Sequence, residues 1–132
     1  MTKKPAYLRM MNKAINYLGN YASSRYRLTE ILQRFADQKL FDYNVGEVAE
    51  ALHKTIDDCT KLGYLDDCQF AVITAQSQRR LGRSKTAIKQ RLRKHALDDE
   101  TISYALLKAD ENSKDGELQA AISFARRRKL GP

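Results

Sequence analysis

The sequence predicts an all-α protein built from tandem three-helix repeats. Its 132 residues include only two prolines and six glycines, so long tracts run without helix-breaking residues. Apolar residues recur at intervals of three and four along most of the chain, which is the spacing of one helix face. Short segments also recur in the same order about 50 residues apart, which is typical of a repeat protein.

Seven helical segments are expected, over about 7–22, 27–39, 45–62, 67–81, 85–96, 99–110 and 116–130. The residues expected to face the core in the first three are Leu8, Met11, Ile15, Leu18, Ala22, then Leu28, Ile31, Leu32, Phe35, then Val45, Val48, Ala49, Leu52, Ile56, Cys59. In the next three they are Phe70, Ile73, Thr74, Ser77, Leu81, then Ile88, Leu92, Ala96, then Ile102, Ala105, Leu106, Ala109, and in the last Leu118, Ala121, Ile122, Ala125.

Polar residues suited to cap a helix precede five of these segments: Asn44 (in a capping box with Glu47), Asp66, Ser84, Asp98 and Asp115. Leu97 and Ile102 occupy the two positions of a hydrophobic staple around the Asp98 cap. The second segment lacks such a residue at Arg27, the position that corresponds to Ser84 in the next repeat, and Ser24 is the nearest substitute.

The stretch GYLDDCQFA at 63–71 marks the junction between two helices. Gly63 suits the end of one helix, and Asp66 with Gln69 forms a capping box for the next, with Leu65 and Phe70 as its hydrophobic staple. The alternative, a catalytic pair of aspartates, requires two carboxylates that converge on one substrate. Adjacent residues at a helix start usually point apart, so the structural interpretation is favoured.

Three pairs of segments support the repeat. ITAQSQRRLG at 73–82 matches ISFARRRKLG at 122–131, VAEAL at 48–52 matches ISYAL at 102–106, and EILQRF at 30–35 matches AIKQRL at 87–92. We therefore expect a first three-helix repeat over 1–63, a second over 64–112, and the first helix of an incomplete third repeat over 113–132. One such unit buries little apolar area alone, so neighbouring units should stack.

Basic residues occur in blocks that contain no acid, and the net charge is +8. The first block holds Arg79, Arg80, Arg83, Lys85, Lys89, Arg91, Arg93 and Lys94, and the second holds Arg126, Arg127, Arg128 and Lys129. Seven acids lie in 42–67 and seven in 98–117. The pattern favours a basic surface for an anionic partner over a merely solvated face.

Within the fifth segment, Lys85, Lys89 and Arg93 form a stripe at intervals of four, about 12 Å long. Like charges at this spacing repel, so a helix that accepts them plausibly uses them. By repeat equivalence, Arg128 and Lys129 take the places of Arg79 and Arg80 one unit later. These residues are suited to contact acidic protein surfaces, DNA phosphates or both.

No motif for catalysis, metal binding or a cofactor is present, so we expect a protein that is not an enzyme and that needs no cofactor. Cys59 is expected in the core, and Cys68 is expected to be exposed near a helix start. The sequence has no apolar run of membrane-spanning length and no signal-peptide segment after Met1, which predicts a cytoplasmic protein.

The motif GYLDDCQFA resembles the signature of the RecX family of recombination regulators. RLTEILQRFADQKL resembles the second helix of that family, and RLGRSKTAIKQRLRKHALDDETISYAL resembles the core of its second repeat. The resemblance covers roughly residues 14–131. The chain departs from the family by stopping after one helix of the third repeat.

This resemblance implies a curved, elongated array of three-helix repeats that binds the RecA recombinase filament on single-stranded DNA. The implied outcome is modulation, usually inhibition, of RecA's ATPase, strand exchange, recombination and SOS activity, by a monomeric regulator. Alternatives from the charge pattern alone are a general nucleic-acid-binding helical module held by phosphates, or a scaffold for another acidic protein.

Overall fold

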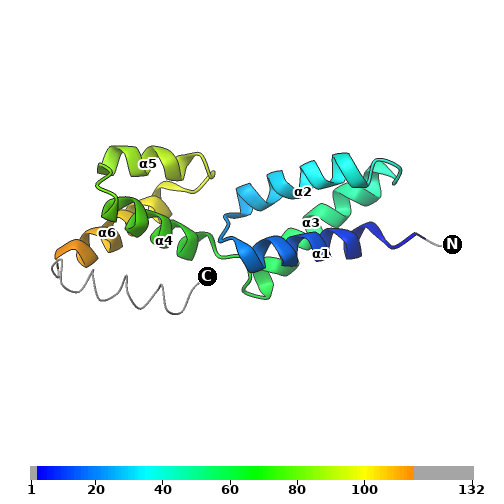
Figure 1. Ribbon diagram of the computed structural model, residues 1–132, viewed down its shortest axis with the longest axis horizontal. Helices are drawn as coiled ribbons and strands as arrows, with labels where there is room; N and C mark the ends of the chain where they lie inside the picture. The colour runs from blue at the N-terminus through cyan, green and yellow to red at the C-terminus, as the bar shows by residue number, and fades with distance from the viewer. Residues whose placement is uncertain (1–2, 115–132) are drawn as a thin grey trace. The chain divides into compact units, whose positions relative to one another are not determined.

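The computed structural model describes residues 3–114 of the protein, and this part is all-helical. The helices are α1 (Ala6–Asn20), α2 (Arg25–Lys39), α3 (Val45–Lys61), α4 (Asp67–Arg80), α5 (Lys85–Arg93) and α6 (Asp99–Lys114). The chain divides into two compact units, Met1–Asp66 and Asp67–Pro132 (Figure 1). The all-α prediction is therefore confirmed. The expected helix at 116–130 lies outside the described residues.

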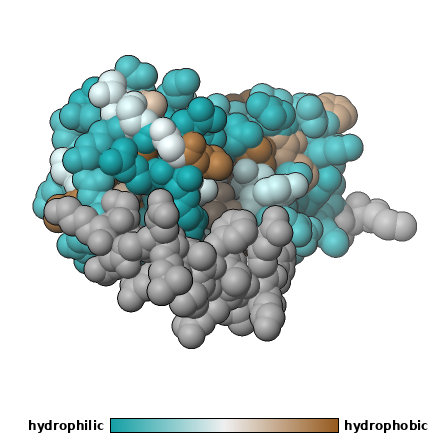
Figure 2. All heavy atoms as spheres, turned by 60° about the vertical axis from the view of Figure 1, so that its left-hand side comes forward, coloured by the Kyte–Doolittle hydropathy of each residue, from teal (hydrophilic) through white to brown (hydrophobic). Residues whose placement is uncertain are grey.

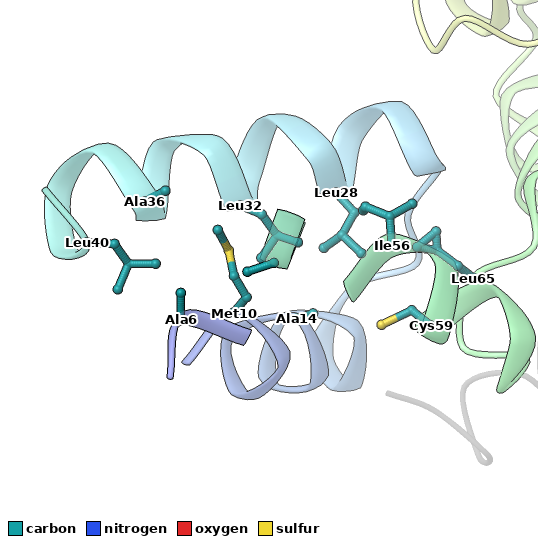
Figure 3. Close-up of a cluster of buried hydrophobic side chains, with 11 residues drawn as sticks. Ala6, Met10, Ala14, Leu28, Leu32, Ala36, Leu40, Ile56, Cys59 and Leu65 are labelled. Carbon is teal, nitrogen blue, oxygen red and sulfur yellow. The ribbon is translucent and has the colours of Figure 1, made fainter. Parts of the chain in front are cut away.

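In the first unit, α1, α2 and α3 surround one apolar core. Its buried members are Ala6, Met10, Ala14, Leu28, Leu32, Ala36, Leu40, Ala51, Ile56, Cys59 and Leu65. Figure 3 shows the side chains of α1, α2 and α3 pointing toward one another in the space between the helices. The most extensive helix contact in this unit joins α1 to α3.

The second unit repeats this order of contacts with α4, α5 and α6. Its buried core consists of Ala71, Ala75, Ile88, Leu92, Leu97, Ile102, Ala105 and Ala109. The packing of α4 on α6 is the most extensive helix contact in the unit. Alanine residues from both helices line this contact, and small side chains allow two helix axes to approach closely.

The buried face predicted for the first helix of each unit was only partly right: Met11, Leu18 and Phe70 are half-buried against the cores, but other members of the predicted faces are exposed. On α1 the fully buried residues are Ala6, Met10 and Ala14, whereas Leu8 and Ile15 are exposed. On α4 they are Ala71 and Ala75, whereas the predicted Ile73 is exposed, as is the predicted Leu81 just after the helix. Both helices carry large apolar residues around much of their circumference, so spacing alone did not show which side packs. The close contact with the third helix selects the alanine side.

At the start of α3 the buried face also differs from the prediction. The predicted core residues Val45 and Ala49 are exposed on α3, while Ile56 and Cys59 are buried as expected. Ala51 and Thr55 are buried and were not predicted. The predictions for α2, α5 and α6 agree better, since Leu28, Leu32, Ile88, Leu92, Ile102 and Ala105 are all buried.

Side-chain caps begin four of the helices. Ser24 accepts a hydrogen bond from the backbone N–H of Arg27, Asn44 from Gly46 and Glu47, Ser84 from Ala87, and Asp98 from Thr101. The missing cap predicted for the second helix is therefore corrected, because α2 begins two residues earlier than expected and Ser24 caps it.

The cap also corrects the register of one internal match. Ser24, Leu28 and Leu32 in α2 play the parts of Ser84, Ile88 and Leu92 in α5, since each helix has a serine cap followed by two buried residues at intervals of four. The match of 30–35 with 87–92 is thus misplaced by about one helical turn.

Glycines with positive φ end two helices, as the sequence predicts. Gly63 follows α3 with φ 81°, and Gly82 follows α4 with φ 84°. The helix α5 ends at Arg93, three residues before its predicted end, and Ala96 then adopts φ 55°. An L-residue is strained in this left-handed region.

The predicted staples have different outcomes. Leu97 and Ile102 belong to the same core, as the staple around Asp98 requires. Leu65, however, is buried in the core of the first unit, whereas Phe70 packs against that of the second. The buried Cys59 and the exposed Cys68 lie as predicted.

Polar contacts join α1 to α3 at two places. The carboxylate of Glu47 accepts a hydrogen bond of 3.1 Å from the backbone N–H of Ala6 and thus stabilises the start of α1. The Tyr7 hydroxyl donates to Asp58 over 2.6 Å, and Lys54 lies 3.2 Å from the same carboxylate. Glu47 therefore serves a neighbouring helix in addition to its place in the predicted capping box.

No helix in residues 3–114 has the length and apolar character needed to cross a membrane. On the face drawn in Figure 2, hydrophilic side chains cover most of the described surface, and the hydrophobic ones form small separate areas.

Candidate functional site: the basic surface of the second unit

Eight of the twelve predicted site residues lie in or next to α4 and α5. Arg79 and Arg80 end α4, Arg83 lies in the turn after it, and Lys85, Lys89, Arg91 and Arg93 belong to α5, with Lys94 at its C-cap. Arg126, Arg127, Arg128 and Lys129 lie outside the described residues. Their alignment with the first group stays a prediction.

The helix α5 presents its cations to solvent because Ile88 and Leu92 fix its other side in the core. Lys85, Lys89 and Arg93 are all exposed, as the helix spacing predicts. The short turn at Gly82 and the Ser84 cap set where α5 begins, and hence which way the stripe faces.

Acids of α6 neutralise both ends of the Lys85–Lys89–Arg93 stripe. Lys85 Nζ lies 2.6 Å from Asp110 Oδ2, and Arg93 lies 3.8 Å from Asp99 Oδ1. Repulsion between the cations is therefore compensated at both ends of the stripe, contrary to the sequence-based expectation. The Arg93 pair is loose, since the Asp99 side chain is 86% exposed, and such a pair contributes little.

Asp110 also contacts α4. Its Oδ1 lies 3.6 Å from Nε of Arg79, so one carboxylate of α6 contacts cations at the end of α4 and at the start of α5. Arg79 in addition donates a hydrogen bond of 3.3 Å to the backbone carbonyl of Arg83. Two of the predicted site residues, Arg79 and Lys85, thus have structural contacts.

Four of the eight site residues in the described part of the chain have no salt bridge there. They are Arg83, Lys89, Arg91 and Lys94, and all are exposed. Exposed cations without acidic neighbours suit an anionic partner, because binding does not first require an internal ion pair to break.

The first unit contains a third basic block that the sequence analysis missed. Residues 1–29 hold six basic residues, Lys3, Lys4, Arg9, Lys13, Arg25 and Arg27, and no acid. They are spread among apolar residues and form no dense basic run. The sequence feature that indicates this block is the absence of any acid before Glu30.

The described residues offer little that suits catalysis. They contain no group of three His, Cys, Asp or Glu side chains placed to hold a metal ion. An apolar cavity of about 310 Å³ lies between α2 and α3, and its one lining carboxylate, Asp37, accepts a hydrogen bond of 3.1 Å from Gln33. Burial raises the pKa of the Cys59 thiol, which keeps this cysteine protonated and unreactive.

Two curated proteins are similar to almost the whole chain. The protein named Regulatory protein RecX from Myxococcus xanthus (strain DK1622) is 33% identical over 131 residues, which cover 97% of this chain and 67% of that protein. The protein of the same name from Agrobacterium fabrum (strain C58 / ATCC 33970) is 29% identical over 121 residues, covering 92% and 62%. The chain thus spans about two thirds of the length of these relatives. It matches no family model and no solved structure.

Proposed function

This chain belongs to the RecX family of regulatory proteins, and we propose that it binds the RecA recombinase filament on single-stranded DNA. Binding lowers the ATPase and strand-exchange activities of the filament and with them its recombination and SOS functions. The role is regulatory rather than enzymatic, and it requires no cofactor.

Besides membership of the family, the observation that supports this proposal is the set of exposed cations around α5. Arg83, Lys89, Arg91 and Lys94 provide positive charge that no acid within the described residues neutralises. A recombinase filament on DNA offers both carboxylates and phosphates, and guanidinium groups bind either in a bidentate manner. The second block, Arg126–Lys129, extends the proposed surface along the sequence.

The proposal is tested by comparing two affinities over a range of salt concentrations. We expect the chain to bind the RecA–DNA filament much more tightly than it binds the same DNA without RecA. Equal affinities with a steep salt dependence would instead indicate the alternative function, a nucleic-acid-binding module held by phosphates alone.

A double variant tests the surface itself. Lys89→Ala with Arg93→Ala removes two charges from the exposed stripe while leaving Ile88 and Leu92 in the core. A matched control, Arg34→Ala with Lys61→Ala, removes two exposed charges from the first unit. We expect weaker filament binding for the first pair and unchanged binding for the second. Equal effects would show that net charge, not this surface, determines binding.

A further inference from the structure

Three cations and two aromatic rings alternate across the surface of the first unit. Lys3 Nζ lies 4.9 Å from the centre of the Tyr43 ring, and the Arg9 guanidinium carbon lies 5.8 Å from the same ring. The guanidinium carbon is also 6.0 Å from the centre of Phe35, which Lys13 Nζ approaches to 5.9 Å. We call this series, Lys3–Tyr43–Arg9–Phe35–Lys13, the cation–aromatic ladder.

Hydrogen bonds hold the ladder in place. The Tyr43 hydroxyl donates to the carbonyl of Lys4 over 2.7 Å, which fixes the N-terminal segment against the turn after α2. Arg9 donates to the carbonyl of Lys39 over 3.3 Å, and Lys3 donates to the carbonyl of Asp42 over 3.0 Å. Cations positioned in this way lose less conformational entropy when they bind an anion.

Positive charge prevails around the ladder. Lys4 and Lys39, whose carbonyls accept these bonds, add two exposed cations to the three in the ladder. The acid in salt-bridge contact with it is Asp42, 2.9 Å from Lys3, and its own side chain is half exposed. The ladder therefore retains unneutralised charge that a polyanion is able to use.

An aromatic pair follows these cations along the chain. Arg9, Lys13 and Tyr17 stand at intervals of four residues on α1, about 12 Å from first to last, and Tyr21 is the C-cap, where the backbone is extended. The rings of Tyr17 and Tyr21 lie 5.1 Å apart at 34°, and Tyr21 is 61% exposed. The row thus passes from fixed cations to an exposed ring.

We propose that this row, from Lys3, Arg9 and Lys13 to Tyr21, is a binding site for single-stranded nucleic acid. The cations contact successive phosphates, and the exposed ring of Tyr21 stacks on an unpaired base. A base offers its face to a side chain only when it is unpaired, which selects a single strand over a duplex. This site goes beyond the proposed regulation, because a bare strand needs no recombinase in order to bind it.

The first test measures binding of the full chain to a fluorescent oligothymidylate at several salt concentrations. For Arg9→Gln and for Lys13→Gln we expect weaker binding and a logarithmic salt slope that is smaller by about 0.7, the value for one lost phosphate contact on a single strand. The matched control is Lys54→Gln, since Lys54 also lies over a tyrosine ring, 4.4 Å from the centre of Tyr7, but outside the ladder. That variant should retain both the affinity and the slope.

The second test separates base stacking from charge. Tyr21→Ser should weaken binding to the oligothymidylate by about fivefold or more, and should leave binding to an abasic strand of the same length unchanged. Tyr26→Ser, which changes another exposed tyrosine, is the control. An equal loss on both strands would overturn the stacking role of Tyr21.

Two further results would overturn the site as a whole. One is an unchanged affinity for the oligothymidylate in both glutamine variants, or an equal loss in Lys54→Gln. The other is a loss of filament binding in the glutamine variants with binding to the bare strand intact, which would assign the ladder to a protein partner. Failure of the proposed regulation is distinguishable, since it appears as unaltered RecA ATPase activity whatever the oligothymidylate results.

Discussion

The ammonium group of Lys85 lies 2.6 Å from the carboxylate of Asp110 and links the first residue of α5 to α6. The first unit has a counterpart at the first residue of α2, where Arg25 lies 3.6 Å from Asp57 of α3. In both units, therefore, the second helix is tied to the third by an ion pair at its start. In the second unit this pair also involves a predicted site residue, Lys85, so the proposed binding surface would draw on a cation that also stabilises the fold.

Asp110→Asn tests this dual role of Lys85. The substitution removes the acid shared by Lys85 and Arg79, so we expect a loss of about 1 kcal/mol in the free energy of unfolding, measured by urea denaturation. The two released cations should at the same time strengthen filament binding at low salt. Glu111→Gln, which removes an exposed ion pair with Lys108 on the same helix, is the control and should change neither quantity appreciably. Weaker filament binding in a folded Asp110→Asn protein would contradict the account.

Ala96→Gly should stabilise the protein. Ala96 adopts φ 55° in the described structure, where an L-residue is strained by roughly 1–2 kcal/mol and glycine is not. Because glycine also makes the unfolded chain more flexible, we expect a net gain of about 0.5–1 kcal/mol in urea denaturation. Ala49→Gly, inside α3, should instead cost up to about 1 kcal/mol. Destabilisation by Ala96→Gly would show that the positive φ carries no strain.

Thr55→Val should also stabilise the first unit. The Thr55 hydroxyl is fully buried, and it has no hydrogen-bond partner among the described residues. Replacing it with a methyl group of similar shape removes an unpaired polar atom, a gain of about 1 kcal/mol in the free energy of unfolding. Thr60 is the comparison, because its hydroxyl donates to the carbonyl of Ile56 over 2.8 Å. Equal gains from Thr55→Val and Thr60→Val would refute the explanation.

The Tyr7–Asp58 hydrogen bond predicts how stability depends on pH. The bond from Tyr7, followed by that from Lys54, lowers the pKa of Asp58 below 3.8, and the bond to Asp58 raises the pKa of Tyr7 above 10.0. The contribution of Asp58 is present above its unfolded pKa and is lost as the pH falls through its folded pKa. That of Tyr7 is present below its unfolded pKa and is lost as the pH rises through its folded pKa.

We therefore expect the difference in free energy of unfolding between the wild-type chain and Tyr7→Phe to be constant near neutral pH. It should shrink below pH 3.8 and above pH 10.0, which urea denaturation at several pH values will measure. A difference that stays constant down to pH 2 would mean that the bond does not favour the ionised carboxylate.

Helix caps and the glycine turns follow from local chemistry, which is why the sequence predicted them well. Gly63 and Gly82 have the positive φ that glycine favours, and Asn44, Ser84 and Asp98 cap helices as expected. These features depend on residues within a few positions of one another. The sequence therefore contains all the information that they require.

The buried faces of α1 and α4 depend instead on a distant helix, and there the prediction was wrong for several residues. Ala6 and Ala14 pack inward while Leu8 and Ile15 remain exposed. Leucine is more hydrophobic than alanine and is therefore the residue expected to be buried, but close packing of two helices favours the smaller side chain. Only the position of the third helix decides between the two faces.

In the candidate sites, too, the local features were predicted and the contacts between distant segments were not. Spacing placed Lys89 on the exposed side of α5, but it did not reveal that Asp110 and Asp99 of α6 pair with Lys85 and Arg93. The cation–aromatic ladder was missed because its members come from the N-terminal segment, α1, α2 and the turn after α2, with Lys3 and Tyr43 40 positions apart.

The most direct measurement is the single-stranded-DNA-dependent ATPase activity of RecA, with this chain titrated in at fixed, moderate salt. The proposed regulation predicts inhibition at concentrations too low to coat the bare strand. It also predicts loss of that inhibition in the folded double variant that combines Lys89→Ala with Arg93→Ala. Unaltered ATPase activity, or inhibition that appears only when the chain coats the bare DNA, would contradict the proposed regulation.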